Sequence, residues 1–158
     1  MDTPESKICP PRWKGYGDQC YILLLDKRAW FDARADCQML GGDLSSPNNQ
    51  QQQDFVYSLL QYGDGHDAWI GFNDLKDESL FEWSSDKQVM YTNWDVFQPQ
   101  HISSSSDCVL ISSQTGGWKD DVCDRQRQYV CQMDQASSDQ PTRQPAIMGC
   151  EQVSYLYC

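Results

Sequence analysis

Histidine, basic residues and long apolar runs are all scarce in this chain of 158 residues. It has two histidines, His66 and His101, and no Cys-x-x-Cys pair, so the spacing of a zinc finger is absent. Its 12 lysines and arginines are outnumbered by 23 aspartates and glutamates, and the formal net charge of −11 argues against nucleic acid or an anionic membrane as a partner. No segment approaches the roughly 18 apolar residues of a membrane span, so we expect no membrane insertion by this segment.

Motifs for catalysis and for processing are missing as well. The chain has no Gly-x-Ser-x-Gly elbow, no phosphate-binding loop and no His-Glu pair at metal spacing, so we do not expect an enzyme. An Asn-x-Ser/Thr acceptor is absent, which argues against N-glycosylation. Residues 1–13 lack the charged and then apolar layout of a signal peptide. We therefore expect a mature fragment or an expressed piece of a longer protein, with Met1 supplied for translation.

Cysteine, by contrast, is abundant. Eight cysteines in a small acidic chain indicate an oxidising, extracellular environment and up to four disulfides. The count alone allows about 105 connectivities. The length suits one domain of ordinary size. The excess of carboxylates suits calcium or a basic partner, although such an excess is more often an ordinary solvated surface.

The first half of the chain predicts a strand pair followed by two helices. "ICPPRW" and "QCYILLL" flank a glycine-containing turn, which allows Cys9 and Cys20 to face each other across a hairpin. A first helix is expected over 28–40 and a second after an N-cap at Ser46, with Gly63 ending it. The expected buried faces are Trp30, Ala33, Cys37 and Leu40 in the first helix and Phe55, Val56, Leu59 and Leu60 in the second.

The second half of the chain predicts short strands, a loop and a tail. The strand candidates are "AWIGF", "LFEW", "QVMYT", "CVLIS" and "QYVCQM". Residues 93–107 form a long loop with one proline and four serines, and long loops in compact domains are more often functional than not. We expect an N-terminal tail over 1–7, one domain over 8–133, and a polar linker or tail over 134–158. That tail contains Cys150 and Cys158 and is a candidate start of a following segment.

This order of elements resembles the long form of the C-type lectin-like domain. "WIGF" is similar to the core signature WIGL of that family, and "GGWKDDVC" (116–123) takes the place of its WND motif and the following cysteine. "LGGDL", "WIGFNDL" and "FEWS" look most like a module of the macrophage mannose receptor group. The resemblance covers 8–133 and implies an α+β fold with two helices packed on small antiparallel sheets and a long irregular loop. It also implies the disulfides Cys9–Cys20, Cys37–Cys131 and Cys108–Cys123.

Sugar-binding members of that family hold the sugar through one calcium ion, and the matching positions here are poor in ligands. The resemblance assigns the ion's ligands to a Glu-Pro-Asn type motif, an acid before the next cysteine, and the Asn-Asp of WND. The corresponding residues are Gln98-Pro99-Gln100, Ser106 and Lys119-Asp120, among which only Asp120 has a carboxylate. Two unit charges 4 Å apart interact by roughly 4 kcal/mol at an effective dielectric near 20, so Lys119 is expected to repel the ion. Pro99 is expected to keep the cis peptide bond of the family.

A second, auxiliary ion site of the family is only partly matched. Asp74, Glu78 and Asp107 match three of its acids, whereas His101 and Ser106 replace other ligands. Three carboxylates allow weak calcium binding at most, and three ordinary surface acids are the alternative. No cofactor is expected to be required.

The expected function is an extracellular, lectin-like binding module of a cell-surface receptor, recognising a protein or a glycan without the primary calcium ion. The expected ligand surface is the loop from Gln98 to Ser106, with Trp118, Lys119 and Asp120 at its base. Trp69, Trp83 and Trp94 are expected in the core. A calcium-dependent carbohydrate-binding lectin with a degenerate site is the alternative, and a structural role through the acidic surface is a third option. Cys150 and Cys158 leave open a local pair or a disulfide-linked dimer.

Overall fold

The sheet is organised around the antiparallel pair formed by β3 (Gln19–Arg28) and β9 (Arg127–Asp134). The computed structural model describes residues 7–137. The other strands of this sheet are β2 (Lys14–Tyr16), β4 (Asp43–Leu44), β5 (Ala68–Asn73), β6 (Glu82–Trp83), β7 (Cys108–Ile111) and β8 (Trp118–Asp121). The order is β2-β3-β9-β5-β7-β8, with β4 paired to β9 and β6 paired to β5. β5 runs parallel to β9, and the α+β class predicted from the sequence is confirmed.

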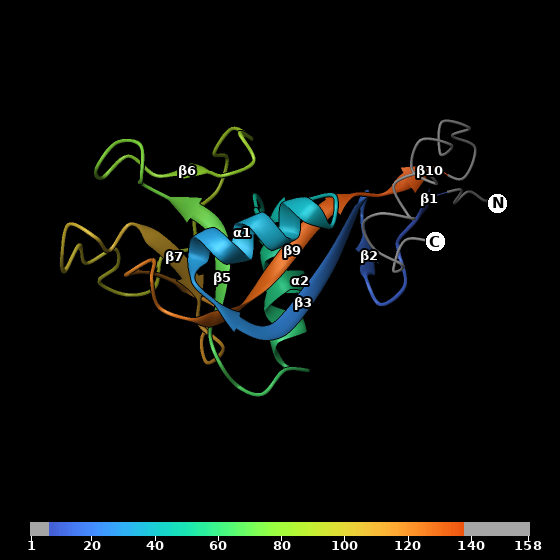
Figure 1. Cartoon of the computed structure of the whole chain (residues 1–158), viewed down its shortest axis with the longest axis horizontal. Helices are drawn as coiled ribbons and strands as arrows, with labels where there is room; N and C mark the ends of the chain where they lie inside the picture. The colour runs from blue at the N-terminus through green and yellow to red at the C-terminus, as the bar shows by residue number, and fades with distance from the viewer. Residues whose placement is uncertain (1–6, 138–158) are drawn as a thin grey trace.

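Two helices cover opposite faces of the sheet (Figure 1). These are α1 (Trp30–Met39) and α2 (Gln50–Leu60). Successive side chains of a strand point to opposite faces, so Trp69 of β5 packs in one core cluster with α1 while Ile70 packs in the other with α2. The indole N–H of Trp30 donates to the carbonyl of Ile70 at 2.8 Å, which ties α1 to β5.

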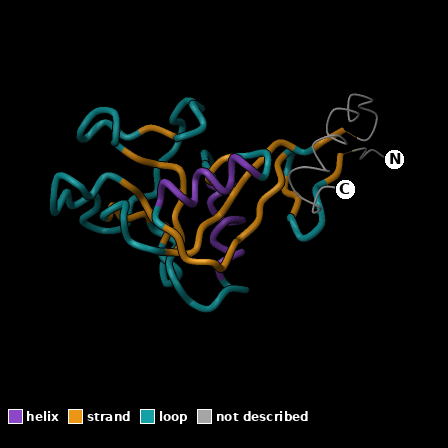
Figure 2. Tube along the Cα trace, in the orientation of Figure 1, coloured by secondary structure: helices purple, strands orange, loops and turns teal. Residues whose placement is uncertain are grey.

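The loops between β5 and β7 gather at one end of the molecule, and the short pair β1 (Lys7–Ile8) and β10 (Ala136–Ser137) lies at the other (Figures 1 and 2). β10 lies beyond residue 133, where the sequence placed the end of the domain, because it pairs with β1. In the described part of the chain no helix has the length and apolar character needed to cross a membrane.

The three disulfides predicted from the sequence are present. Cys37–Cys131 joins α1 to β9, and Cys108–Cys123 joins the start of β7 to the segment after β8. Cys9–Cys20 links the N-terminal segment to β3. Cys150 and Cys158 lie outside the described residues, so their pairing stays a prediction.

Several predicted elements differ from the structure. The strand expected over 8–13 is wrong, because Pro10 and Pro11 have no N–H to donate, and Lys14–Tyr16 pairs with β3 instead. The segment 88–92 is not a strand, since its polar groups bond to side chains: the N–H of Met90 donates to Asn48 at 2.9 Å. The second helix begins at Gln50, not after Ser46. Its N-cap is Asn49, whose side chain accepts from the backbone N–H of Gln52 at 2.8 Å.

Candidate functional site

The long loop (93–107) begins beside β8 and is attached to it by backbone hydrogen bonds. The N–H of Trp118 donates to the carbonyl of Asn93, and the N–H of Asp95 donates to the carbonyl of Trp118, both at 2.9 Å. A Cβ on Gly117 would lie 2.7 Å from the Cβ of Asp95, so only glycine permits this close approach. The Gly-Gly-Trp stretch therefore positions the start of the loop against the sheet.

Residues 98–101 form the corner of the loop, and the carboxylate of Asp120 holds their backbone in place. Asp120 is buried on β8 and accepts from the backbone N–H groups of Gln100 at 2.9 Å and His101 at 2.8 Å. The side-chain oxygen of Gln98 accepts in return from the backbone N–H of Asp120 at 3.4 Å. The Gln98–Pro99 peptide bond is cis, as the sequence predicted. The one carboxylate that survives in the calcium motif is thus used to hold the loop backbone.

Four residues of the predicted ligand surface do not reach it: Trp118, Ser106 and Asp120 are buried, and Lys119 lies on the other face of β8. Trp118 has no exposed surface, and its indole N–H donates to the Gln53 side chain at 2.8 Å. Its expected role at the ligand surface is therefore wrong, and it belongs to the same core cluster as Trp83. Ser106, at the expected end of that surface, is only 4% exposed. Gln100 is exposed, and Gln98 and Pro99 are partly exposed, so these three remain candidates for ligand contact.

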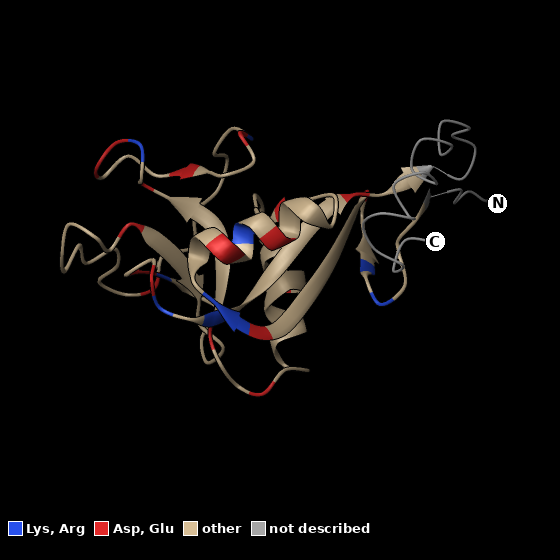
Figure 3. Cartoon of the chain, viewed as in Figure 1, with Lys and Arg blue, Asp and Glu red and all other residues tan. Residues whose placement is uncertain are grey.

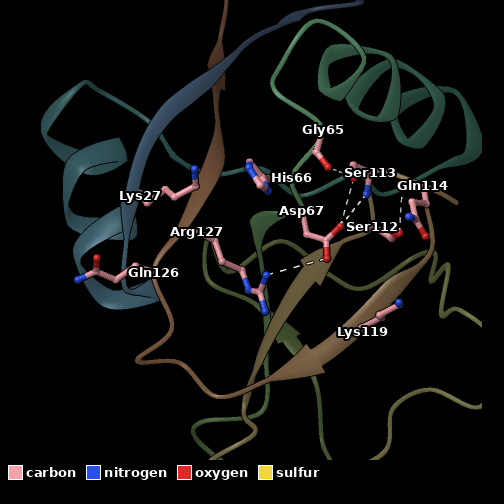
Figure 4. A pocket seen from close by; sticks show the side chains of 10 residues that line it. All are labelled: Lys27, Gly65, His66, Asp67, Ser112, Ser113, Gln114, Lys119, Gln126 and Arg127. Carbon is pink, nitrogen blue, oxygen red and sulfur yellow. Dashed lines mark hydrogen bonds and ion pairs between the residues drawn. The ribbon is translucent and has the colours of Figure 1, made fainter.

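Lys119 points away from the loop corner. β8 alternates between buried and partly exposed residues, which places Lys119 on the face opposite Trp118 and Asp120. There it lines a polar cavity of about 320 Å³ with Lys27, Asp67 and Arg127 (Figure 4). The expected repulsion between Lys119 and an ion at the corner is therefore weaker than the sequence suggested. At the corner itself, Asp120 is the one carboxylate among the positions of the calcium motif.

That cavity is a cationic region on an acidic protein. Figure 3 shows acidic residues spread over the loops and a basic stretch at the end of β3, where Lys27 and Arg28 lie. The guanidinium of Arg127 pairs with Asp121 and lies 4.0 Å from Asp67, so part of its charge is neutralised. Lys27 has its own partner in Asp64, at 3.7 Å.

Exposed apolar residues on either side of the corner were not predicted from the sequence. The side chains of Val96, Phe97 and Ile102 are 72%, 87% and 79% exposed. Three large apolar residues besides Trp94, in a loop otherwise rich in serine, are the signal that could have identified them. An exposed apolar group of this kind is typical of a contact surface for another molecule.

A cluster of acids surrounds His101 on the inner side of the loop. Its Nδ1 atom lies 3.5 Å from an oxygen of Glu78, 3.9 Å from one of Asp74 and 3.8 Å from one of Asp120. Asp74 follows β5 directly and is 1% exposed. The sequence placed Asp74, Glu78, Asp107 and His101 at one auxiliary ion site, and the structure brings the His101 ring close to Asp74 and Glu78. It also adds Asp120, which the sequence assigned to the other ion site.

The environment of this cluster changes the acidity of Asp107. Burial, together with the nearby carboxyl groups of Asp74 and Glu78, raises the pKa of Asp107 to about 6. Each carboxylate disfavours ionisation of the next one, so the group as a whole attracts a cation or a proton.

Calcium does not fit either set of residues well. It takes six to eight oxygen ligands, several of them charged. At the corner, Asp120 is already occupied by two backbone N–H groups, and Gln98 bonds to the strand. In the acid cluster an imidazole nitrogen stands among the oxygens, and nitrogen is not a ligand that calcium prefers.

Comparisons with known proteins agree with this fold. A family model of the lectin C-type domain matches residues 26–133. The chain is 34% identical over 124 residues to the C-type mannose receptor 2 of Homo sapiens, covering 78% of this chain and 8% of the receptor. It is 36% identical over 116 residues to the low affinity immunoglobulin epsilon Fc receptor of Mus musculus, covering 73% of this chain and 34% of that receptor. The chain thus spans only a small part of the length of these relatives.

Solved structures give the same result. Human lithostathine superposes with a TM-score of 0.76 at 32% identity, covering 85% of this chain and 96% of that one. The cow C-type carbohydrate-recognition domain of CD23 superposes with a TM-score of 0.74 at 29% identity, covering 81% of this chain and 97% of that one.

Proposed function

The chain belongs to the family of C-type lectin domains, and from that premise we propose that it binds a ligand without the family's primary calcium ion. It is an extracellular, disulfide-bonded domain of the kind found in receptors, and its relatives are lectin and receptor domains rather than enzymes. The proposed ligand is a protein, or a glycan that the domain recognises without calcium. The proposed contact surface is the long loop around Gln98, Pro99 and Gln100.

The hydrogen bonding of Asp120 is the observation that carries this proposal. Two backbone N–H groups of the loop donate to its buried carboxylate. The negative charge of Asp120 is therefore used to hold the loop rather than to bind an ion. A loop that is closed by the protein's own groups keeps its shape when divalent ions are removed. Ligand binding by that loop should then be insensitive to chelators.

The exposed apolar residues favour a protein as the ligand. Phe97 and its neighbours Val96 and Ile102 present large apolar side chains to solvent beside the polar corner. Aromatic residues are enriched at protein interfaces, where they act as buried anchors surrounded by polar groups. Sugar hydroxyls would instead require several fixed polar groups, and at the corner these are largely occupied by the backbone.

A paired binding screen tests the proposal. The oxidised chain is applied to a glycan array and to an array of extracellular proteins, each in calcium and again in EDTA. We expect a ligand whose signal persists in EDTA and is lost in Phe97→Asp but not in Tyr62→Asp. Tyr62 is the matched control, because its ring is 86% exposed at the end of α2. Binding to mannose-type glycans that EDTA abolishes would instead establish a calcium-dependent lectin with a degenerate site.

A further inference from the structure

Within residues 7–137, one group of side chains has the arrangement of metal ligands: Asp74, Glu78 and His101, whose ligand atoms lie within 4.8 Å of one another. The Nδ1 atom of His101 is buried and has no hydrogen-bond partner. Three carboxylate oxygens surround it at 3.5, 3.8 and 3.9 Å, which is too far for a hydrogen bond to any of them. A space is therefore left between one nitrogen and three oxygens.

Asp74 provides a second observation that points to a cation. Its side chain has no exposed surface, and its Oδ1 atom has no hydrogen-bond partner. The Oδ1 atom of Asp107, beside it, is also buried without a partner. Buried carboxylate oxygens are costly unless a hydrogen-bond donor or a positive charge compensates them. In the described part of the chain neither a lysine nor an arginine forms an ion pair with Asp74, Glu78 or Asp107.

The donor set indicates which class of ion would fit. Calcium and magnesium prefer oxygen ligands, whereas imidazole nitrogen suits zinc and its transition-metal neighbours. Two ligand atoms about 2.1 Å from a tetrahedral zinc ion are about 3.4 Å apart. The 3.5 Å between His101 Nδ1 and Glu78 Oε2 is close to that value. The 3.9 Å to Asp74 Oδ2, which also accepts from the backbone N–H of Ser79 at 2.8 Å, requires a small movement of the side chains.

We propose that this cluster is a site for a borderline divalent ion such as Zn²⁺, bound by His101, Asp74 and Glu78. Asp107 interacts with Asp74 and Glu78 but lies outside this group of three, so it would have to move to become a fourth ligand. Asp120 positions the histidine, because its carboxylate accepts from the backbone N–H of His101 at 2.8 Å. The ring of His101 is partly open to solvent, with 32% of its side chain exposed, which gives the ion a path into the site.

Ion binding at this site would connect two loops. His101 belongs to the long loop, whereas Asp74 and Glu78 lie in the segment between β5 and β6. An ion shared by both would fix the long loop relative to β5. This inference does not depend on which ligand the loop recognises, since zinc binding is measured with the metal alone.

Calorimetry on the oxidised full chain tests the site, with ZnCl₂ and CaCl₂ titrated separately near neutral pH. We expect one zinc ion per chain, bound at least about 100-fold more tightly than calcium. His101→Ala should weaken zinc binding by on the order of 100-fold or more. His66→Ala is the matched control and should change nothing, because His66 is the other histidine of the chain and lies next to Asp64 instead. His101→Asp should weaken zinc and strengthen calcium, because it restores an oxygen ligand.

The imidazole spectrum of the unaltered chain gives an independent readout. Nitrogen NMR should show the Nδ1 resonance of one histidine shifting on saturation with zinc and disappearing from the spectrum in His101→Ala. Zinc captured by thiols would survive that substitution, since the variant keeps all eight cysteines. Equal zinc affinity in His101→Ala and in the unaltered chain would overturn the proposal. So would an Nδ1 resonance that zinc leaves unmoved.

Discussion

Asp95 connects the start of the long loop to the turn before β8. Its carboxylate accepts from the hydroxyl of Thr115 at 2.8 Å and from the backbone N–H of Val96 at 2.9 Å. These two bonds hold the pKa of Asp95 below the ordinary value of 3.8, and the bond from the Thr115 hydroxyl has the larger effect. A lowered pKa in the folded state means that the ionised carboxylate stabilises the fold above the ordinary pKa. This contribution is lost as the pH falls through the folded value.

We predict that Thr115→Val lowers the free energy of unfolding by about 1 kcal/mol at neutral pH. The difference in free energy of unfolding between the variant and the unaltered chain should stay constant down to about pH 4. Below that pH the difference should narrow, because Asp95 becomes protonated. Urea unfolding at a series of pH values measures this. Thr115→Ser keeps the hydroxyl and should behave like the unaltered chain. A gap that widens on acidification would contradict the assignment to Asp95.

Single residues of the site were predictable from the sequence only in part. The motif positions identified Asp120 as the surviving carboxylate and placed Asp74 and Glu78 near the loop. Whether a residue faces the loop depends on strand pairing, which the motif does not contain. Lys119 and Asp120 are adjacent in the chain, yet they lie on opposite faces of β8. The motif positions also placed His101 at the auxiliary ion site, but the direction of its ring depends on the fold of the loop itself, including its positive φ of 50°.

The long loop as an element depends on its attachment to β8 through Asp120. We predict that Asp120→Asn, which keeps the shape of the side chain, removes one of the two accepted bonds and the charge that strengthens them. The cost should be about 1.5 kcal/mol or more, so the amides of Gln100 and His101 should exchange with solvent roughly tenfold faster. Hydrogen exchange followed by NMR measures both amides directly.

Asp124→Asn is the control for that change, because Asp124 is an exposed aspartate in the turn after β8. It removes the same charge from the same region without touching the loop. If both variants accelerated exchange at Gln100 and His101 equally, net charge rather than the two hydrogen bonds would hold the corner.

Elements with a clear hydrophobic period were predicted, and those defined by side-chain bonding were not. Both helices were found because their apolar residues repeat at helical spacing, as Trp30, Ala33 and Cys37 do in α1 and Val56, Leu59 and Leu60 do in α2. β8 was missed because "WKDD" has one apolar residue among charged ones, and its pairing with β7 sets its conformation. The start of α2 was misplaced because Ser46 and Asn49 are both good N-cap residues, and only the structure distinguishes them.

On the scale of the whole molecule, the domain has two core clusters, one on each face of the sheet. Much of the remaining chain is loop. The tryptophans and cysteines that fill these clusters made the overall fold predictable, because large aromatic residues and disulfides are rarely placed outside a core. The disulfides differ widely in the length of chain they enclose. Cys37–Cys131 spans 94 residues, whereas Cys9–Cys20 spans 11.

This difference predicts the order in which the disulfides stabilise the domain. A cross-link removes conformational entropy from the unfolded chain, by about 4–5 kcal/mol for a loop near 100 residues and about 3 kcal/mol for one near ten. The double variant Cys37→Ala with Cys131→Ala should therefore lose more stability than Cys9→Ala with Cys20→Ala, by about 2 kcal/mol. Urea unfolding of each variant measures the loss, at low temperature should the first be marginally folded. Should the two variants lose the same free energy, the constraint on the unfolded chain would not be what distinguishes the bridges. Local packing around each pair would then set their contributions.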